Sequence, residues 1–136
     1  MSVTECLLFL LAKAYQTVHQ ATREHLKPYG LTPIQCLVTM FIIQSNKQIA
    51  AWEIAKELKL DNATLSGILE RLEAGGWIVR TLSQQDKRLS LISPTEKVFD
   101  LEKEIEMKRT QTEEVILQNF SLEEKLLLKR MLRDMK

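Results

Sequence analysis

The middle of the chain carries a short helix, a tight turn, a second helix and a pair of strands, and this order constrains the fold more than any other feature. The spacing of apolar residues predicts the first helix over about Ala51 to Leu58 and the second over Asn62 to Ala74, with Asp61 as the N-cap of the second. The turn between them is Lys59-Leu60-Asp61, and Gly75-Gly76 ends the second helix. Two short helices joined in this way can present the second one to the major groove of duplex DNA.

A β-hairpin is predicted directly behind the second helix. Its strands are expected over about Trp77 to Leu82 and Arg88 to Ser93, which are rich in Trp, Ile, Val, Thr and Leu. The polar turn Ser83 to Lys87 joins them. A hairpin in this position can reach the DNA backbone or minor groove beside the second helix.

Two helices are predicted on the N-terminal side. The first covers about Thr4 to Lys27 and opens with the segment Cys6 to Ala12, which is apolar all round. The next begins at a capping box of Thr32 and Gln35, with Pro33 at its first helical position, and should end near Ser45 to Lys47. Its apolar face is predicted to comprise Ile34, Leu37, Val38, Phe41 and Ile42.

Two more helices are predicted on the C-terminal side. The segment Ser93 to Glu96 reads as a capping box with Pro94 at the first position of a long charged helix that runs to about Gln118. Ser121 and Glu124 cap a final helix. The leucine-rich side of this helix comprises Leu122, Leu126, Leu127, Met131 and Leu132. The expected fold class is mainly α with a small β-hairpin wing.

Length and composition indicate one globular domain over residues 1–136, of which 45% are hydrophobic and 27% charged. The formal net charge of +1 neither requires nor excludes a polyanionic partner, so any basic surface has to be local. The apolar run Cys6 to Ala12 is far shorter than the roughly 20 residues of a membrane span. We therefore expect a cytoplasmic protein without a membrane partner.

Neither a catalytic site nor a metal or cofactor site is expected. The two cysteines are 30 residues apart, and His19 and His25 lack neighbours that would complete a ligand set. No Ser-His-Asp arrangement or carboxylate pair can be argued from spacing. The chain is therefore expected not to be an enzyme.

A candidate DNA-binding surface combines the second helix of the central pair with the hairpin. The residues that face outward from the helix are Asn62, Ala63, Thr64, Ser66, Gly67 and Arg71, and those of the hairpin are Asp86, Lys87 and Arg88. Small polar side chains suit close approach to base edges and phosphates. A merely solvated helix face is the alternative, and the basic residues of the hairpin favour the DNA interpretation.

Six motifs lie in order along the chain: Leu31-Thr32-Pro33, Ile54 to Leu58, Thr64-Leu65, Glu70 to Arg80, Asp86 to Arg88, and Leu91 to Glu96. With them the sequence resembles the MarR family of winged helix-turn-helix transcriptional regulators over nearly its whole length. The most specific part is the Asp-x-Arg of the hairpin at its distance behind Arg71-Leu72-Glu73.

The resemblance implies a homodimer that binds a palindromic operator in double-stranded DNA, as a repressor. Residues 1–30 and 95–136 would form intertwined dimerisation helices, and residues 31–94 the winged helix. Arg88 would enter the minor groove and Asp86 would orient it, while the outward residues named above would meet the major groove. A small-molecule effector would bind where the first, second and fifth helices meet the winged part. The apolar segment Cys6 to Ala12 independently predicts an obligate dimer, because a single chain of this size cannot cover it.

Two interpretations of Cys6 stay open. Some relatives in the family use a cysteine near the start of the first helix as a switch for organic peroxides. The tyrosines of those sensors are replaced here by Leu10, Gln20, Pro33 and Cys36, which favours a small buried hydrophobe instead. Cys36 itself is expected in the core.

The main competing function is a winged-helix module that binds a partner protein and has lost DNA contact. The near-neutral net charge permits it. Arg71, Asp86 and Arg88 argue against it.

Overall fold

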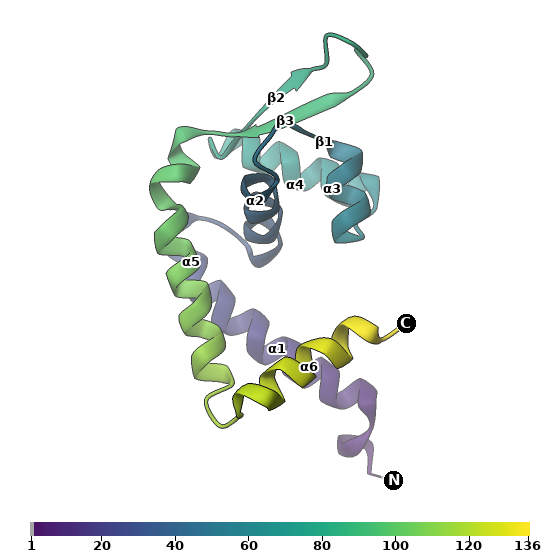
Figure 1. The fold of residues 1–136 in the computed structure, drawn as a ribbon, viewed down its shortest axis with the longest axis vertical. Helices are drawn as coiled ribbons and strands as arrows, with labels where there is room; N and C mark the ends of the chain where they lie inside the picture. Colours follow the sequence, from purple (N-terminus) through teal and green to yellow (C-terminus); the bar gives the residue numbers. More distant parts are fainter. Residues whose placement is uncertain (1) are drawn as a thin grey trace.

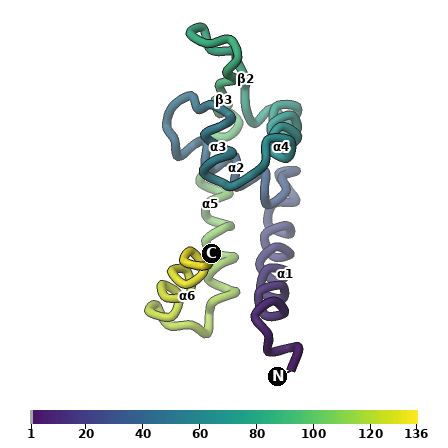
Figure 2. The backbone as a smooth tube through the Cα atoms, turned by 90° about the vertical axis from the view of Figure 1, so that its right-hand side faces the viewer, coloured from purple at the N-terminus to yellow at the C-terminus, as the bar shows by residue number. Residues whose placement is uncertain are grey.

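The structure, a computed structural model, describes residues 2–136 as a helical protein with a small three-stranded sheet (Figure 1). Its elements in chain order are the 3-10 turn η1 (Val3–Glu5), α1 (Leu7–Leu26), the 3-10 turn η2 (Lys27–Tyr29), α2 (Pro33–Ser45), β1 (Ile49–Ala50), α3 (Ala51–Leu58), α4 (Asn62–Ala74), β2 (Ile78–Leu82), β3 (Ser90–Pro94), α5 (Glu96–Ile116) and α6 (Leu122–Asp134). The sheet and helices α2 to α4 form one end of the molecule. Helices α1, α5 and α6 form the other end, where both termini lie (Figure 2).

The predicted fold class, mainly α with a β-hairpin wing, is confirmed. The sheet is antiparallel with strand order β1-β3-β2, and Arg80 pairs with Ile92 in the middle of the hairpin. The sequence analysis missed β1, whose Ile49 pairs with Ile92 on the other side of β3. This strand has only two residues, so it has no periodicity of its own. It fixes the start of α3 against the base of the wing.

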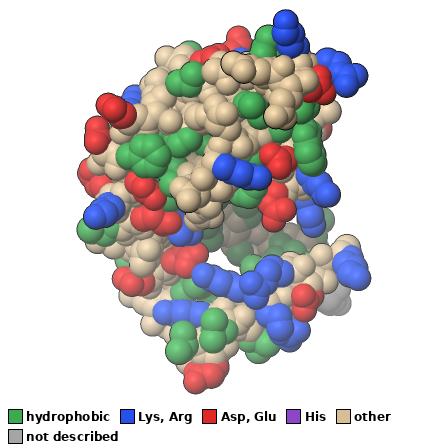
Figure 3. Space-filling view, turned by 45° about the horizontal axis from the view of Figure 1, so that its top comes forward, with side chains coloured by type: hydrophobic (Ala, Val, Ile, Leu, Met, Phe, Trp, Pro, Cys, Tyr) green, Lys and Arg blue, Asp and Glu red, His purple; other side chains and the backbone are tan. Residues whose placement is uncertain are grey.

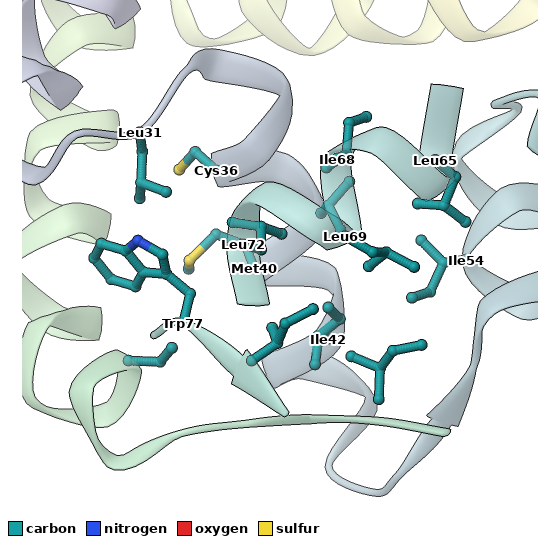
Figure 4. Packing of buried hydrophobic residues seen from close by; sticks show 14 of the residues in the cluster. Leu31, Cys36, Met40, Ile42, Ile54, Leu65, Ile68, Leu69, Leu72 and Trp77 are labelled. Atoms are coloured by element: carbon teal, nitrogen blue, oxygen red, sulfur yellow. The ribbon is translucent and has the colours of Figure 1, made fainter. Parts of the chain in front are cut away.

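The core lies in the winged half and draws on every element there. Its fully buried side chains are Ile42, Ile54, Leu69, Leu72, Ile92, Val38 and Val98. Figure 4 shows this cluster extending from Trp77 at one end to Ile54 at the other. Burial of each large apolar side chain stabilises the fold by about 1.5–3 kcal/mol, so this cluster holds α4 and the hairpin in a fixed relation.

Three predicted helix starts are confirmed by hydrogen bonds. Thr32 and Gln35 form a complete capping box at α2, and Ser121 and Glu124 form one at α6. The Asp61 carboxylate accepts from the backbone N–H of Thr64 at the start of α4. Each cap satisfies N–H groups that would otherwise lack a partner and typically contributes about 1 kcal/mol.

The predicted apolar face of α2 is wrong in part. Val38 and Ile42 are buried as expected, but Ile34 and Leu37 are exposed. Met40 and Thr39 are buried in their place. The reason is that α2 packs against α1, α3, α4 and β3 at once, so its buried surface is wider than a single stripe.

The predicted start of α5 is also wrong. Pro94 lies in β3, paired with Ile78, and the helix begins at Glu96 with Thr95 as its N-cap. The Thr95 hydroxyl does not cap the helix but donates to the carbonyl oxygen of Gly76 at 2.6 Å. Lys97 adds a second link, because its Nζ donates to the Gly75 carbonyl and lies 4.3 Å from the centre of the Trp77 ring. The end of α4 is thus fastened to the start of α5.

In the other half, α1 packs against α5, and the His25 side chain of α1 makes a hydrogen bond with Thr112 of α5. The apolar start of the chain is largely exposed, and Leu8 is 81% accessible. The apolar residues of α6 named above are exposed too. Among the described residues, no single helix is long and apolar enough to cross a membrane; α1 with η2 and α2 pass that test only as a pair bent by 72°.

Candidate nucleic-acid interface

Helix α4 has one buried side and one exposed side. Leu65, Ile68, Leu69 and Leu72 face the core. The residues predicted to face outward do so: Asn62, Ala63, Thr64, Ser66 and Arg71 are exposed, and Gly67 is half-buried. We call these six residues the outward face of α4. It offers an amide, hydroxyls, a guanidinium and, at its centre, almost no side-chain bulk.

The first turn of this face is fixed by Asp61. Its carboxylate accepts from the Thr64 backbone N–H at 2.7 Å and from the Thr64 hydroxyl at 2.8 Å. These two bonds hold the pKa of Asp61 below its usual value. Because the Thr64 hydroxyl donates to the cap, it is left to act as an acceptor toward a ligand.

Gly67 has no internal reason to be glycine. A Cβ placed on it would meet no atom of the protein within 4 Å, and its φ is not positive. Glycine inside a helix costs about 0.5–1 kcal/mol relative to alanine. Gly75, by contrast, is required by packing, since a Cβ there would lie 2.9 Å from Cδ1 of Trp77.

The tip of the wing carries an internal ion pair. Arg88 Nε donates to Oδ1 of Asp86 at 3.0 Å, and Arg88 Nη2 donates to Oδ2 at 3.2 Å. These bonds lower the pKa of the Asp86 carboxyl. The Arg88 side chain is nevertheless 90% accessible, and Lys87 beside it is exposed. Figure 3 shows Lys and Arg side chains at the upper right of the molecule and a larger group of them in its lower half.

A second ion pair links α4 to the hairpin. Arg80 Nε and Nη2 both donate to Oε1 of Glu73, at 3.3 and 3.2 Å. Arg80 is half-buried and lies on the same side of the hairpin as Ile78 and Ile92, the side that faces the helices. The pair therefore links the end of α4 to β2 and places the Arg80 guanidinium beside the helix.

A groove of about 300 Å³ runs between α4 and the wing. Its walls are Ala51, Trp52, Asn62, Leu65, Ser66, Leu69, Arg80, Arg88, Leu89 and Ser90. We call it the α4–wing groove. Sequence reasoning missed Trp52, because α3 was assigned only an inner face. Its exposure, 55%, could be recognised only once the structure placed the start of α3 beside the wing.

The two cysteines differ in burial. Cys36 is buried in the core as predicted, and burial raises the pKa of its thiol to about 11. Cys6 is half-buried and serves as the N-cap residue of α1 rather than lying within the helix, and its side chain makes no capping hydrogen bond. Within residues 2–136, no three His, Cys, Asp or Glu side chains are grouped so that they could hold a metal ion.

A second hollow lies near the expected effector crevice. It measures about 240 Å³ and is lined by Arg23, Glu24, Lys27, Gly30, Leu31 and Thr32. These residues come from the end of α1, from η2 and from the loop before α2. None of them belongs to α5, so this hollow reproduces only part of the predicted lining.

Sequence comparison connects the chain to known regulators. Residues 29–89 match the sequence model of the MarR family. The HTH-type transcriptional regulator SarZ of Staphylococcus epidermidis is 30% identical over 96 residues, which are 71% of this chain and 64% of the relative. The match thus spans less than two thirds of that relative. The uncharacterised HTH-type transcriptional regulator YwoH of Bacillus subtilis is 27% identical over 123 residues, 90% of this chain and 88% of the relative.

Solved structures share the fold over the full chain. BpsR of Bordetella bronchiseptica, whose DNA binding is regulated by 6-hydroxynicotinic acid, has a TM-score of 0.89 at 22% identity and covers 100% of this chain and 99% of its own. A mutant MarR from E. coli complexed with operator DNA has a TM-score of 0.87 at 23% identity. The match covers 98% of this chain and 97% of that one. The fold is therefore that of MarR winged-helix proteins.

Proposed function

We propose that the chain belongs to the MarR family, whose sequence model matches residues 29–89, and that it is a transcriptional regulator that binds duplex DNA through α4 and the wing. The observation that carries this proposal is the placement of the outward face of α4 beside an accessible arginine on the wing. The outward face of α4 suits base edges in a major groove, and the wing arginine suits phosphate or a narrow minor groove. A MarR relative is known in complex with operator DNA.

We propose that the chain acts as a homodimer on a palindromic operator. The exposed apolar residues of α1 and α6 lie in the half that is remote from the wing, where a second copy can cover them (Figure 1). A two-fold dimer would present two wings and two α4 helices to half-sites about one DNA turn, or ~34 Å, apart.

Repression, cytoplasmic location and control by a small molecule belong to the same proposal. Oxidation of Cys6 is the less favoured form of control, because the tyrosines of the peroxide sensors are replaced here. Small-molecule control is supported by relatives: BpsR responds to 6-hydroxynicotinic acid, and CouR of Rhodococcus jostii binds p-coumaroyl-CoA. A comparison of DNA affinity before and after hydroperoxide, in the parent and in Cys6→Ala, decides the role of Cys6.

The test of DNA binding is selection of duplexes from a random pool, followed by affinity measurements over a range of salt concentrations. A DNA-binding regulator should enrich a palindromic sequence and lose affinity steeply as salt rises, because neutralised phosphates release counterions. Ser66→Ala should change the enriched sequence more than the affinity. Weak binding that no sequence improves would favour the competing function, a winged-helix module for a protein partner.

A further inference from the structure

We propose that the α4–wing groove receives the sugar–phosphate strand that separates the major groove from the neighbouring minor groove, and that Trp52 is a DNA-contacting residue on its wall. This inference rests on the proposed function and extends the contact surface to α3. None of the predicted site residues belongs to that helix.

The first argument is geometric. If α4 lies in a major groove and Arg88 at the wing tip reaches the adjacent minor groove, one DNA backbone must cross the space between them. The α4–wing groove occupies that space, since Asn62 and Ser66 line one side and Arg88 and Ser90 the other. Pairing of β1 with β3 brings the start of α3, with Ala51 and Trp52, to the same groove.

The second argument is charge. The walls of the groove carry two guanidinium groups, those of Arg80 and Arg88, and none of the lining residues is acidic. The carboxylates of Glu73 and Asp86 pair with these arginines without lining the groove. They hold the guanidinium groups in position, and the remaining N–H groups stay able to donate to phosphate oxygens.

The third argument is the exposure of Trp52. Its indole is 55% accessible, whereas Trp77, the other tryptophan of the chain, is 3% accessible and packs in the core. Trp52 lies in the winged half, away from the exposed leucines of α1 and α6 that a second copy would cover. An indole combines a broad apolar face, which can pack on deoxyribose, with an N–H that can donate to a phosphate oxygen.

Tryptophan fluorescence tests the proposal directly, with the enriched duplex as the probe. In the free protein, iodide should quench Trp52 and leave Trp77 bright; Trp52→Phe should abolish the quenchable part and thereby assign it. Bound duplex should protect Trp52 from iodide. Protection that is absent at saturating DNA would overturn the proposal.

Affinity provides the second readout. Trp52→Ala should weaken binding about tenfold, equally for preferred and unrelated duplexes, because a backbone contact carries no sequence information. Phe99→Ala is the matched control, since Phe99 is an aromatic residue of equal exposure, 55%, that does not line the groove. It should bind like the parent. Trp52→Phe should be intermediate, because it keeps a ring but loses the N–H donor.

The outcomes separate this inference from the proposed function. Suppose that the parent binds DNA and that Arg88→Ala weakens this binding. If a folded Trp52→Ala then binds like the parent, the groove contact is wrong, while DNA binding by α4 and the wing stands. If Phe99→Ala weakens binding as much as Trp52→Ala, the effect is not specific to the groove, and the proposal is overturned. A parent chain that binds no duplex would overturn both proposals.

Discussion

Arg88 makes three hydrogen bonds to Asp86, one from its backbone N–H and two from its guanidinium, at 3.0, 3.0 and 3.2 Å. This pair spans only two residues, and its three hydrogen bonds orient the guanidinium at the tip of the wing. An arginine whose orientation is set before binding loses less conformational entropy when it contacts DNA.

Arg88→Ala should weaken operator binding and flatten its salt dependence. If each wing neutralises one phosphate, the slope of log affinity against log salt should fall by roughly 1.8 for the dimer. Affinity titrations at several salt concentrations measure this. Arg88→Lys is the control: it keeps the charge and the slope but loses the paired geometry. An Arg88→Ala dimer that is folded by circular dichroism, with the affinity and slope of the parent, would refute the wing assignment.

The contribution of the wing should not change between pH 5 and pH 8. The bonds from Arg88 lower the pKa of Asp86 from its usual value of 3.8, so the carboxylate stays charged over this whole range. A carboxyl group whose pKa is lowered by folding stabilises the folded state at pH values above its unfolded pKa. This stabilisation is lost only as the pH falls through the folded pKa. The affinity ratio of parent to Arg88→Ala, measured at each pH, should therefore be constant. A ratio that falls between pH 8 and pH 5 would mean that another group controls the wing.

Gly67→Ala should stabilise the fold and impair DNA binding. The new methyl group meets no protein atom within 4 Å, and alanine is the better helix former by about 0.5–1 kcal/mol. The midpoint temperature of thermal unfolding should rise by about 2–4 °C. The affinity for the enriched duplex should fall, because the methyl group stands where α4 approaches the bases. Equal affinity in a stabilised variant would show that α4 keeps its distance from DNA at this point.

Leu126→Glu should dissociate the proposed dimer. Leu126 is 61% exposed on α6, and a carboxylate there would be buried by a second copy at high cost. Sedimentation at micromolar concentration should show twice the chain mass of 15.8 kDa for the parent and a smaller mass for the variant. Leu82→Glu is the control, since Leu82 is 66% exposed on the wing and should leave the dimer intact. A well-folded parent monomer would contradict the dimer itself.

Cys36 should be inert in the native protein. Burial raises the pKa of its thiol from 9.0 to about 11, so the reactive thiolate is absent near neutral pH. A thiol reagent at pH 8 should label a Cys6→Ala variant only after denaturation.

The folded state also loses stability as the pH rises from about 9 toward 11, because the unfolded thiol ionises first. The free energy of unfolding of Cys36→Ala should fall less than that of the parent over this pH range. Rapid labelling of Cys36 in the native protein would contradict its burial.

Local chemistry made much of this fold predictable. The caps at Thr32, Asp61 and Ser121 have their partners within three residues, so the sequence alone contains both ends of each hydrogen bond. The pairing of Asp86 with Arg88 at the wing tip is also local, but it was expected from the family resemblance. The apolar spacing of α4 predicted its buried side because one stripe of that helix faces the core.

Partners distant in sequence explain what was missed. Thr95 resembles a helix cap, but its hydroxyl donates to Gly76, 19 residues earlier in the chain. The short strand β1 exists because Ile92 lies beside Ile49. Trp52 enters the candidate site for the same reason, since this pairing brings α3 to the wing. The apolar periodicity of one segment cannot predict contacts with residues that lie far away in the sequence.

Helix α5 belongs to both halves of the molecule: Val98 near its start is buried in the winged core, and Thr112 near its end contacts His25 of α1. Its 21 residues make a rod of about 30 Å. A tilt of about 10° at the far end of such a rod displaces the winged half by ~5 Å, and two protomers that tilt in opposite senses change the distance between their wings by ~10 Å. That distance is close to three base-pair steps out of the ten in a DNA turn of about 34 Å. A rotation of about 10° between α1 and α5 is therefore enough to move a dimer out of register with its two half-sites.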